Sequence, residues 1–152
     1  IGDHLFGLPI SRVRDVFEPA RLTRVPLAPP DVAGILNLRG RIMTVIEMRS
    51  RLDLGTRLPS QPVMAVGIEF KGESYGLLID SVGEVMQLRS SACEANPANL
   101  DPRLGRVAAG VYRLEGQLMV VLDVDRVLDN KNNASPHEAG GEANQSVNAS
   151  PA

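Results

Sequence analysis

Length, composition and charge restrict the kind of protein that this sequence can encode. The chain has 152 residues and 16.3 kDa, with 43% hydrophobic and 22% charged residues, values that predict one soluble globular domain. No apolar run approaches the ~18 residues of a membrane-spanning helix. The net charge of -2 and 3% aromatic residues argue against general nucleic-acid binding. One cysteine, Cys93, and two histidines, His4 and His137, exclude an intramolecular disulfide and a zinc-ligand spacing.

Short apolar or alternating segments separated by turns run through most of the chain, as in small antiparallel sheets. The predicted strands are Leu5–Ile10, Val13–Phe17, Leu22–Val25, Ile35–Leu38, Ile42–Met48, Val63–Phe70, Tyr75–Ile79, Val82–Leu88, Gly110–Leu114 and Gln117–Leu122. The predicted fold class is therefore all-β. Because the chain begins at Ile1 within a strand-like pattern, we expect the native N-terminus to be missing.

Three glycine dipeptides stand between pairs of apolar runs, where glycine can adopt a positive φ. They are Arg39-Gly40, Lys71-Gly72 and Glu115-Gly116. Each predicts a β-hairpin. Short helices are expected in only two places: after Pro30, with Asp31 in the first turn, and at Val124–Leu128.

The folded unit is predicted to be 1–130, followed by a disordered tail at 131–152. Apart from alanines, Val147 is the only apolar residue of the tail, which cannot bury enough surface to offset the entropy of ordering. Within the folded unit the charge is uneven. Residues 1–60 carry nine Arg against six acids, and 61–130 carry six basic residues against ten acids.

An internal repeat divides the folded unit into two β-subdomains, about 1–60 and 61–130. FGLPISRVRDV (6–16) returns as YGLLIDSVGEV (75–85), with five identities in eleven positions. GILNLRGRIMTVIE (34–47) returns as GVYRLEGQLMVVLD (110–123) in the same order. The repeat predicts two similar units of about five strands, packed as small barrels around one hydrophobic core.

No residue pattern supports an enzyme or a cofactor site. Cys93 is followed by Glu94 in a polar loop, and the histidine nearest to it in sequence is in the tail, so a thiol nucleophile with a base is not expected. Asp123 and Asp125 are expected to begin the helix at Val124–Leu128, where carboxylates favour the N-terminus. No glycine-rich phosphate loop occurs.

The difference between the two repeats singles out one arginine. Asn37-Leu38-Arg39-Gly40 corresponds to Arg113-Leu114-Glu115-Gly116, so a guanidinium replaces a carboxylate at the equivalent hairpin tip. The shared leucine and glycine are explained by folding. Arg39 is a candidate partner contact, since arginine offers a planar set of donors and is enriched in interface cores.

At these residues the sequence resembles the CheW family of bacterial chemotaxis adaptors. Four stretches carry the resemblance, in family order: FGLPISRVRDVF, LTRVPLAPPDVAGILNLRGRIMTVIEMRSRL, YGLLIDSVGEV and GVYRLEGQLMVVLDVDRVL. It implies a fold of two five-stranded SH3-like barrels that share a core, and a non-enzymatic scaffold without cofactor or metal. The implied partners are the cytoplasmic tips of chemoreceptors and the regulatory domain of the histidine kinase CheA. The implied location is the cytoplasm, at receptor arrays, without membrane insertion and with a mainly monomeric free protein.

The resemblance also assigns roles by position. It implies receptor binding by Arg39, Asn37 and Val16, and kinase binding by Asp15 and Gly34.

Two side chains depart from the family pattern: Glu47 replaces the usual Asp, and Asp31 replaces a bulkier apolar or aromatic residue. A first strand that is truncated is a third departure. An isolated regulatory domain of CheA, or of a CheV-type protein, is the alternative reading.

Overall fold

The computed structural model describes residues 1–2, 4–19 and 21–129, and the tail predicted at 131–152 lies outside these residues. The eight strands are β1 (Leu5–Gly7), β2 (Val13–Phe17), β3 (Val32–Leu38), β4 (Arg41–Glu47), β5 (Met64–Phe70), β6 (Glu73–Ile79), β7 (Ala108–Leu114) and β8 (Gln117–Leu122). The helices are short: η1 (Ile10–Arg12), α1 (Met48–Arg51), η2 (Ser90–Ala92), α2 (Pro102–Gly105) and α3 (Val124–Leu128). The all-β class is confirmed.

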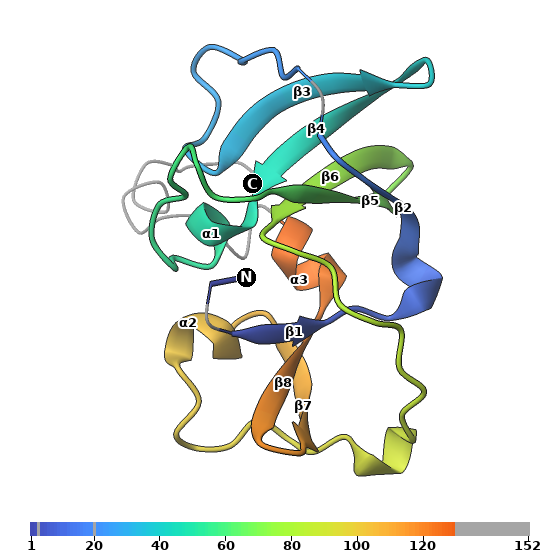
Figure 1. Cartoon of the computed structure of the whole chain (residues 1–152), viewed down its shortest axis with the longest axis vertical. Helices are drawn as coiled ribbons and strands as arrows, with labels where there is room; N and C mark the ends of the chain where they lie inside the picture. Colours follow the sequence, from blue (N-terminus) through green and yellow to red (C-terminus); the bar gives the residue numbers. More distant parts are fainter. Residues whose placement is uncertain (3, 20, 130–152) are drawn as a thin grey trace, which may run out of the picture.

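The strands form two sheets, one above the other in Figure 1, with α3 between them. The larger sheet has the order β2-β5-β6-β4-β3 and the smaller sheet the order β1-β8-β7. The described strands are therefore five and three, not five in each unit as the repeat predicted. The sheets also do not follow a division near residue 60, because β5 and β6 lie in the larger sheet and β1 in the smaller one.

The internal repeat is visible in the pairing register. β1 runs parallel to β8 with Phe6 opposite Val120, and β6 runs parallel to β4 with Tyr75 opposite Thr44. These are equivalent pairs of the two repeats. The antiparallel pairs β3–β4 and β7–β8 also correspond, each with an irregularity just before its glycine, Gly34 or Gly110. The β3–β4 hairpin of the first half thus pairs with β6 of the second half, and the β7–β8 hairpin of the second half pairs with β1 of the first.

The three predicted hairpins are confirmed as the antiparallel pairs β3–β4, β5–β6 and β7–β8. Arg39 and Gly40 both have positive φ, 52° and 82°, as a type I′ turn requires, and Lys71 and Gly72 repeat this pattern with 52° and 78°.

The hydrophobic core has a central cluster to which both sheets contribute. Ile46 and Leu77 of the larger sheet pack with Leu122 of the smaller sheet and with Val127 and Leu128 of α3. Each sheet also has a cluster of its own, one around Val45 and one around Val111. The arrangement agrees with the predicted shared core.

Some predicted elements are wrong. The first strand ends at Gly7, because Pro9 has no N–H for a ladder and precedes the turn η1. Residues 22–25 form only an isolated bridge, Thr23 to Ile35, and Pro26 prevents its extension. No helix follows Pro30; Asp31 lies in a turn and β3 begins at Val32.

The predicted strand Val82–Leu88 is also wrong. Its apolar pattern suits a strand, but no described strand pairs with it, and Val82, Val85, Met86 and Leu88 are exposed. Helix α3 was predicted with the correct bounds. Helices α1 and α2 were not predicted.

Candidate functional site

The turn between β3 and β4 presents Arg39 to solvent. Its side chain is 76% exposed. The backbone conformation is left-handed, which costs an arginine free energy that glycine would not lose. The Asn37 side-chain Oδ1 accepts a hydrogen bond of 2.8 Å from the Gly40 N–H and thereby holds the turn. A locally fixed turn thus carries an exposed, charged side chain.

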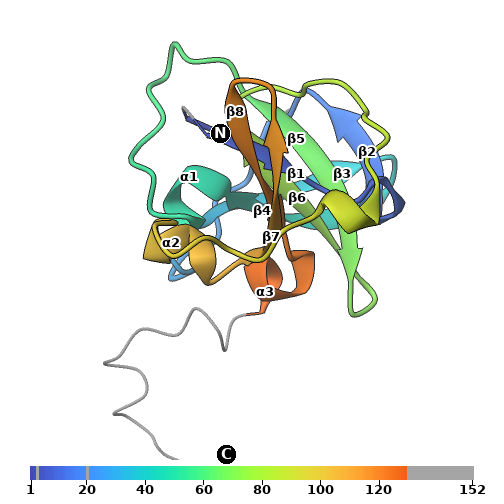
Figure 2. The same cartoon turned by 90° about the horizontal axis from the view of Figure 1, so that it is seen from below.

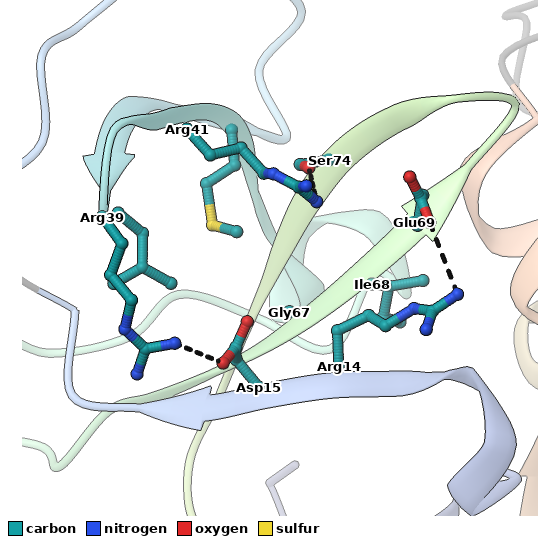
Figure 3. Close-up of a pocket in the computed structure, with 10 residues that line it drawn as sticks. Arg14, Asp15, Arg39, Arg41, Gly67, Ile68, Glu69 and Ser74 are labelled. Atoms are coloured by element: carbon teal, nitrogen blue, oxygen red, sulfur yellow. Dashed lines mark hydrogen bonds and ion pairs between the residues drawn. The ribbon is translucent and has the colours of Figure 1, made fainter.

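Arg39 reaches from the turn toward β2, although β2 and β3 are the two edge strands of the larger sheet. Its guanidinium donates a hydrogen bond of 3.0 Å to Asp15 Oδ1 (Figure 3). Such a partly exposed ion pair is worth at most about 1 kcal/mol. A guanidinium has five N–H donors, and this is the only bond that the described residues make with it. Most of its donors can therefore bind an incoming carboxylate or carbonyl.

The pairing of β2 with β5 positions the side chain of Asp15. The register of these strands shifts between Val13 and Asp15, and a bulge of this kind re-aims side chains. Arg14 and Asp15 consequently line the same cavity although they are adjacent in sequence. Across the pair lies Gly67, where an added Cβ would stand 3.2 Å from the Asp15 Cβ. Glycine at this position leaves room for the carboxylate.

Arg39 and Asp15 belong to the rim of an open cavity of about 440 Å³ on the larger sheet. Its lining residues are Arg14, Asp15, Leu38, Arg39, Arg41, Met43, Gly67, Ile68, Glu69 and Ser74. Two further polar contacts cross it, Arg14 to Glu69 at 3.4 Å and Arg41 to Ser74 at 3.4 Å. The lining thus combines three arginines and two carboxylates with apolar side chains. This composition suits a protein segment that carries both carboxylate and apolar groups.

The structure brings only two of the five predicted site residues together. Arg39 and Asp15 touch, although the resemblance implies different partners for them. Val16 is exposed on β2 but does not line the cavity. Asn37 supports the turn, and Gly34 is buried against the Thr23 carbonyl. Their binding roles stay predictions.

Several lining residues were not singled out from the sequence. Arg14, Arg41, Glu69 and Ser74 come from four strands, and Gly67 matters only because β5 lies opposite Asp15. The closeness of Arg41 to Arg39 in the NLRGR segment was the one available signal. The others depend on strand register, which the sequence pattern does not specify.

A second polar region lies beside helix α1 and contains two arginines between two carboxylates. Arg57 binds Glu47 at 2.9 and 3.0 Å and Asp80 at 2.7 Å, and Arg49 binds both oxygens of Asp80 at 3.1 and 2.7 Å. All four side chains are largely buried. The bonds from Arg49 hold the pKa of Asp80 far below its usual value. This network fixes the loop after α1 to the ends of β4 and β6.

Asp123 and Asp125, which were considered for catalysis, make contacts that stabilise the fold. Asp123 Oδ1 accepts from the N–H groups of Asp125 and Arg126 at 3.1 and 3.3 Å, which confirms the predicted cap of α3. Asp125 pairs with Arg12 at 3.1 Å, and Cys93 is an exposed free thiol. Within the described ranges, no three His, Cys, Asp or Glu side chains gather as metal ligands would. None of the helices in this part of the chain has the length and apolar character needed to cross a bilayer.

These features define the protein as an all-β domain that is built from a repeated unit and has a charged, open cavity at one hairpin tip. A family model described as the CheW-like domain matches residues 1–132. The chain therefore belongs to the CheW family, a family of non-catalytic chemotaxis scaffolds, and the resemblance seen in the sequence is confirmed.

Curated relatives and a solved structure agree with this assignment. Chemotaxis protein CheW of Rhizobium meliloti (strain 1021) is 26% identical over 127 residues, which cover 84% of this chain and 82% of that protein. Chemotaxis protein CheW of Bacillus subtilis (strain 168) is 24% identical over 130 residues, covering 86% and 83%. The crystal structure of scaffolding protein TtCheW from Thermoanaerobacter tengcongensis superposes with a TM-score of 0.75 at 26% identity, covering 85% of this chain and 88% of that one.

Proposed function

We propose that this chain is a non-enzymatic adaptor that couples the cytoplasmic tips of chemoreceptors to the regulatory domain of the kinase CheA. It works in the cytoplasm, at receptor arrays. Family membership supports the scaffold role, and the relatives' names place them in chemotaxis. The observation that carries the proposal is Arg39, an exposed guanidinium on a fixed turn at the rim of a charged and apolar cavity.

The receptor surface consists of Arg39 with Val16 and the turn that Asn37 supports. In the free protein, Asp15 occupies one donor of Arg39 at 3.0 Å. A receptor carboxylate or carbonyl binds the remaining donors, and apolar receptor side chains cover Leu38 in the cavity. The kinase surface includes Asp15 and the region that Gly34 shapes. Neither role needs bond-making chemistry, a metal or a cofactor.

Arg39→Ala tests the proposal, with titration of a receptor-tip fragment as the measurement. The variant should weaken receptor binding by about 1.5 to 3 kcal/mol, the scale of a hydrogen bond to a charged group. Arg39→Lys should retain only part of the wild-type receptor affinity, because lysine lacks the planar set of donors. The midpoint of thermal unfolding should hardly change, since the Arg39–Asp15 pair is exposed.

Arg113→Ala is a matched control, because Arg113 is an exposed arginine near the equivalent hairpin tip and pairs with Glu94 at 3.1 Å. It should leave receptor affinity unchanged. Unchanged receptor affinity of Arg39→Ala would refute the assignment. Equal loss of receptor and kinase binding with a lowered unfolding temperature would identify Arg39 as a structural turn residue instead.

A further inference from the structure

Arg51, in helix α1, is a buried arginine with partners in two other parts of the fold. Its guanidinium donates one hydrogen bond to the Asp31 carboxylate, just before β3, and another to the carbonyl oxygen of Val127 in α3. The side chain of Arg51 is 4% exposed and that of Asp31 is 18% exposed. A charged side chain is seldom buried so completely unless it is paired and hydrogen-bonded. Asp31 provides that pairing for Arg51.

The second repeat has an apolar residue at the position of Asp31. The Glu47 N–H donates a hydrogen bond of 2.8 Å to the Asp31 carbonyl oxygen, and the Asp123 N–H donates one of 2.7 Å to the Val107 carbonyl oxygen. Glu47 and Asp123 are repeat equivalents that cap the helix following their strand. Asp31 therefore corresponds to Val107, both in the sequence and in the backbone contact that it makes.

The second repeat also has an apolar residue at the position of Arg51. Arg51 is the fourth residue of α1, and Val127 is the fourth residue of α3. Val107 and Val127 are both buried in the central cluster, at 4% and 1% exposure. One repeat thus has two valines where the other has a buried ion pair. Because valines are accepted at the equivalent positions, the repeated fold does not require charge there.

The bonds of Arg51 differ in kind from the other contacts between the two sheets. The central cluster joins the sheets through apolar contacts, which have no preferred direction. Hydrogen bonds from a planar guanidinium are directional. Two other arginines also join these parts, Arg12 to Asp125 of α3 and Arg103 of α2 to the Asp53 carbonyl, but their side chains are 33% and 42% exposed. Exposed polar contacts constrain a structure less than buried ones.

We propose that the Asp31–Arg51 pair is a conformational device that fixes the orientation of the two sheets. Asp31 holds the guanidinium, and Arg51 is the positioning residue that binds α3, the helix between the sheets (Figure 1). Conformational specificity accounts for a buried ion pair at positions where apolar residues also fit. A partner that contacts both sheets then meets a preorganised surface. The inference does not depend on the proposed function.

The double substitution Asp31→Val with Arg51→Met tests the proposal through thermal unfolding. Valine is the residue of the repeat equivalent, and methionine is a flexible apolar side chain that fills irregular space. The midpoint of unfolding should stay within about 3 °C of wild type, because an apolar pair can replace a buried ion pair. Arg51→Met alone should lower the midpoint by roughly 10 °C or more, since it leaves the Asp31 carboxylate largely buried without its partner.

Pulsed electron paramagnetic resonance measures the orientation of the sheets in the same proteins. One spin label is attached to the exposed thiol of Cys93, which lies beside β7, and the other to Ile42→Cys on β4, where the wild-type side chain is 59% exposed. The Asp31–Arg51 chain should give one narrow distance distribution. The double variant should give a broader distribution or a second distance. Unchanged stability with a changed orientation would not follow from a merely stabilising role.

Arg12→Gln is the matched control, because Arg12 is another arginine that binds α3, through Asp125 at 3.1 Å, but is more exposed. This variant, labelled at the same two positions, should retain the narrow distribution. Broadening as large as that of the double variant would show that polar contacts to α3 act together and that Arg51 has no special role.

Two results for the double variant would overturn the proposal. A distance distribution identical to that of the Asp31–Arg51 chain would show that apolar packing alone fixes the orientation. A midpoint lowered as far as that of Arg51→Met alone, or a chain that does not fold, would show that the ion pair is needed for stability. None of these results depends on whether the protein binds a receptor or a kinase, so the proposed function stands or fails separately.

Discussion

The two repeats share their internal framework and differ at their hairpin tips. Gly34 and Gly110 both lie against a carbonyl of a bridging loop, and Glu47 and Asp123 both cap the helix that follows their strand. At the tips, Arg39 pairs with Asp15, whereas its equivalent Glu115 and the equivalent of Asp15, Glu84, are both carboxylates. The residues that the repeats share thus support the backbone, and the tip residues that differ are those for which we propose a separate binding role.

The largest expected effect concerns the shared framework. Ile46 is 2% exposed in the central cluster, and Leu122 is its repeat equivalent. Ile46→Ala should lower the free energy of unfolding by roughly 2 to 5 kcal/mol, and Leu122→Ala should cost a similar amount, because both leave a cavity in the same core. Urea denaturation measures both. A loss below about 1 kcal/mol at either position would contradict the shared core.

Exchanging the charges at the tips tests the difference directly. Arg39→Glu places a carboxylate near Asp15 and should weaken receptor-tip binding by about 2 to 3 kcal/mol, with little change in stability. Glu115→Arg should leave receptor affinity as it is, because the cavity lies only in the larger sheet. Titration of the receptor fragment against both variants is the measurement. Receptor binding gained through Glu115→Arg would show that the two tips are interchangeable.

The buried ion network joins Glu47, Arg49 and Arg57 of the first repeat to Asp80 of the second. The repeat equivalent of Asp80 is Ser11, which cannot supply a carboxylate for a second network of this kind. Asp80→Asn should cost about 1.5 to 3 kcal/mol, the scale of hydrogen bonds to a charged group, because Arg49 and Arg57 lose a charged partner in a largely buried site. The pKa of Asp80 is lowered in the folded state, so its contribution is present at neutral pH and is lost as the pH falls below about 4.

Stability measured from pH 7 to pH 2 tests this assignment. The wild type should lose more stability than Asp80→Asn over the acid part of the range. Parallel curves for the two proteins would show that the network contributes nothing to folding.

The smallest effect is expected for the tail. Removing 131–152 should leave the unfolding temperature unchanged, because this segment has too few apolar residues to bury surface. Differential scanning calorimetry of the shortened chain is the measurement. A drop similar to that of Ile46→Ala would mean that the tail docks on the domain.

Local signals in the sequence were sufficient for the hairpins, the repeat and α3. Each depends on nearby residues: glycine at a turn, matching order in two blocks, or Asp123 ahead of an apolar pattern. The helix α1 was missed because Met48 continues the apolar pattern of β4, and the cap from Glu47 was not distinguished from a strand residue.

Predictions that depend on partners distant in the sequence were less successful. Residues 82–88 have the apolar pattern of a strand but no described neighbour to pair with. The contact between Arg39 and Asp15, and the need for Gly67 beside them, follow from the register of β2 and β5. Arg39 itself could be identified because the two halves of one sequence could be compared.

Simultaneous binding of both partners tests the adaptor role most directly. Receptor-tip fragment fixed to a surface should retain the kinase regulatory domain only when this chain is added, and Arg39→Ala should abolish most of that retention while direct kinase binding in solution persists. The free chain should sediment as a monomer in the same buffer. Kinase domain that binds the receptor surface equally without the chain, or a chain that binds either partner only in the absence of the other, would contradict the account.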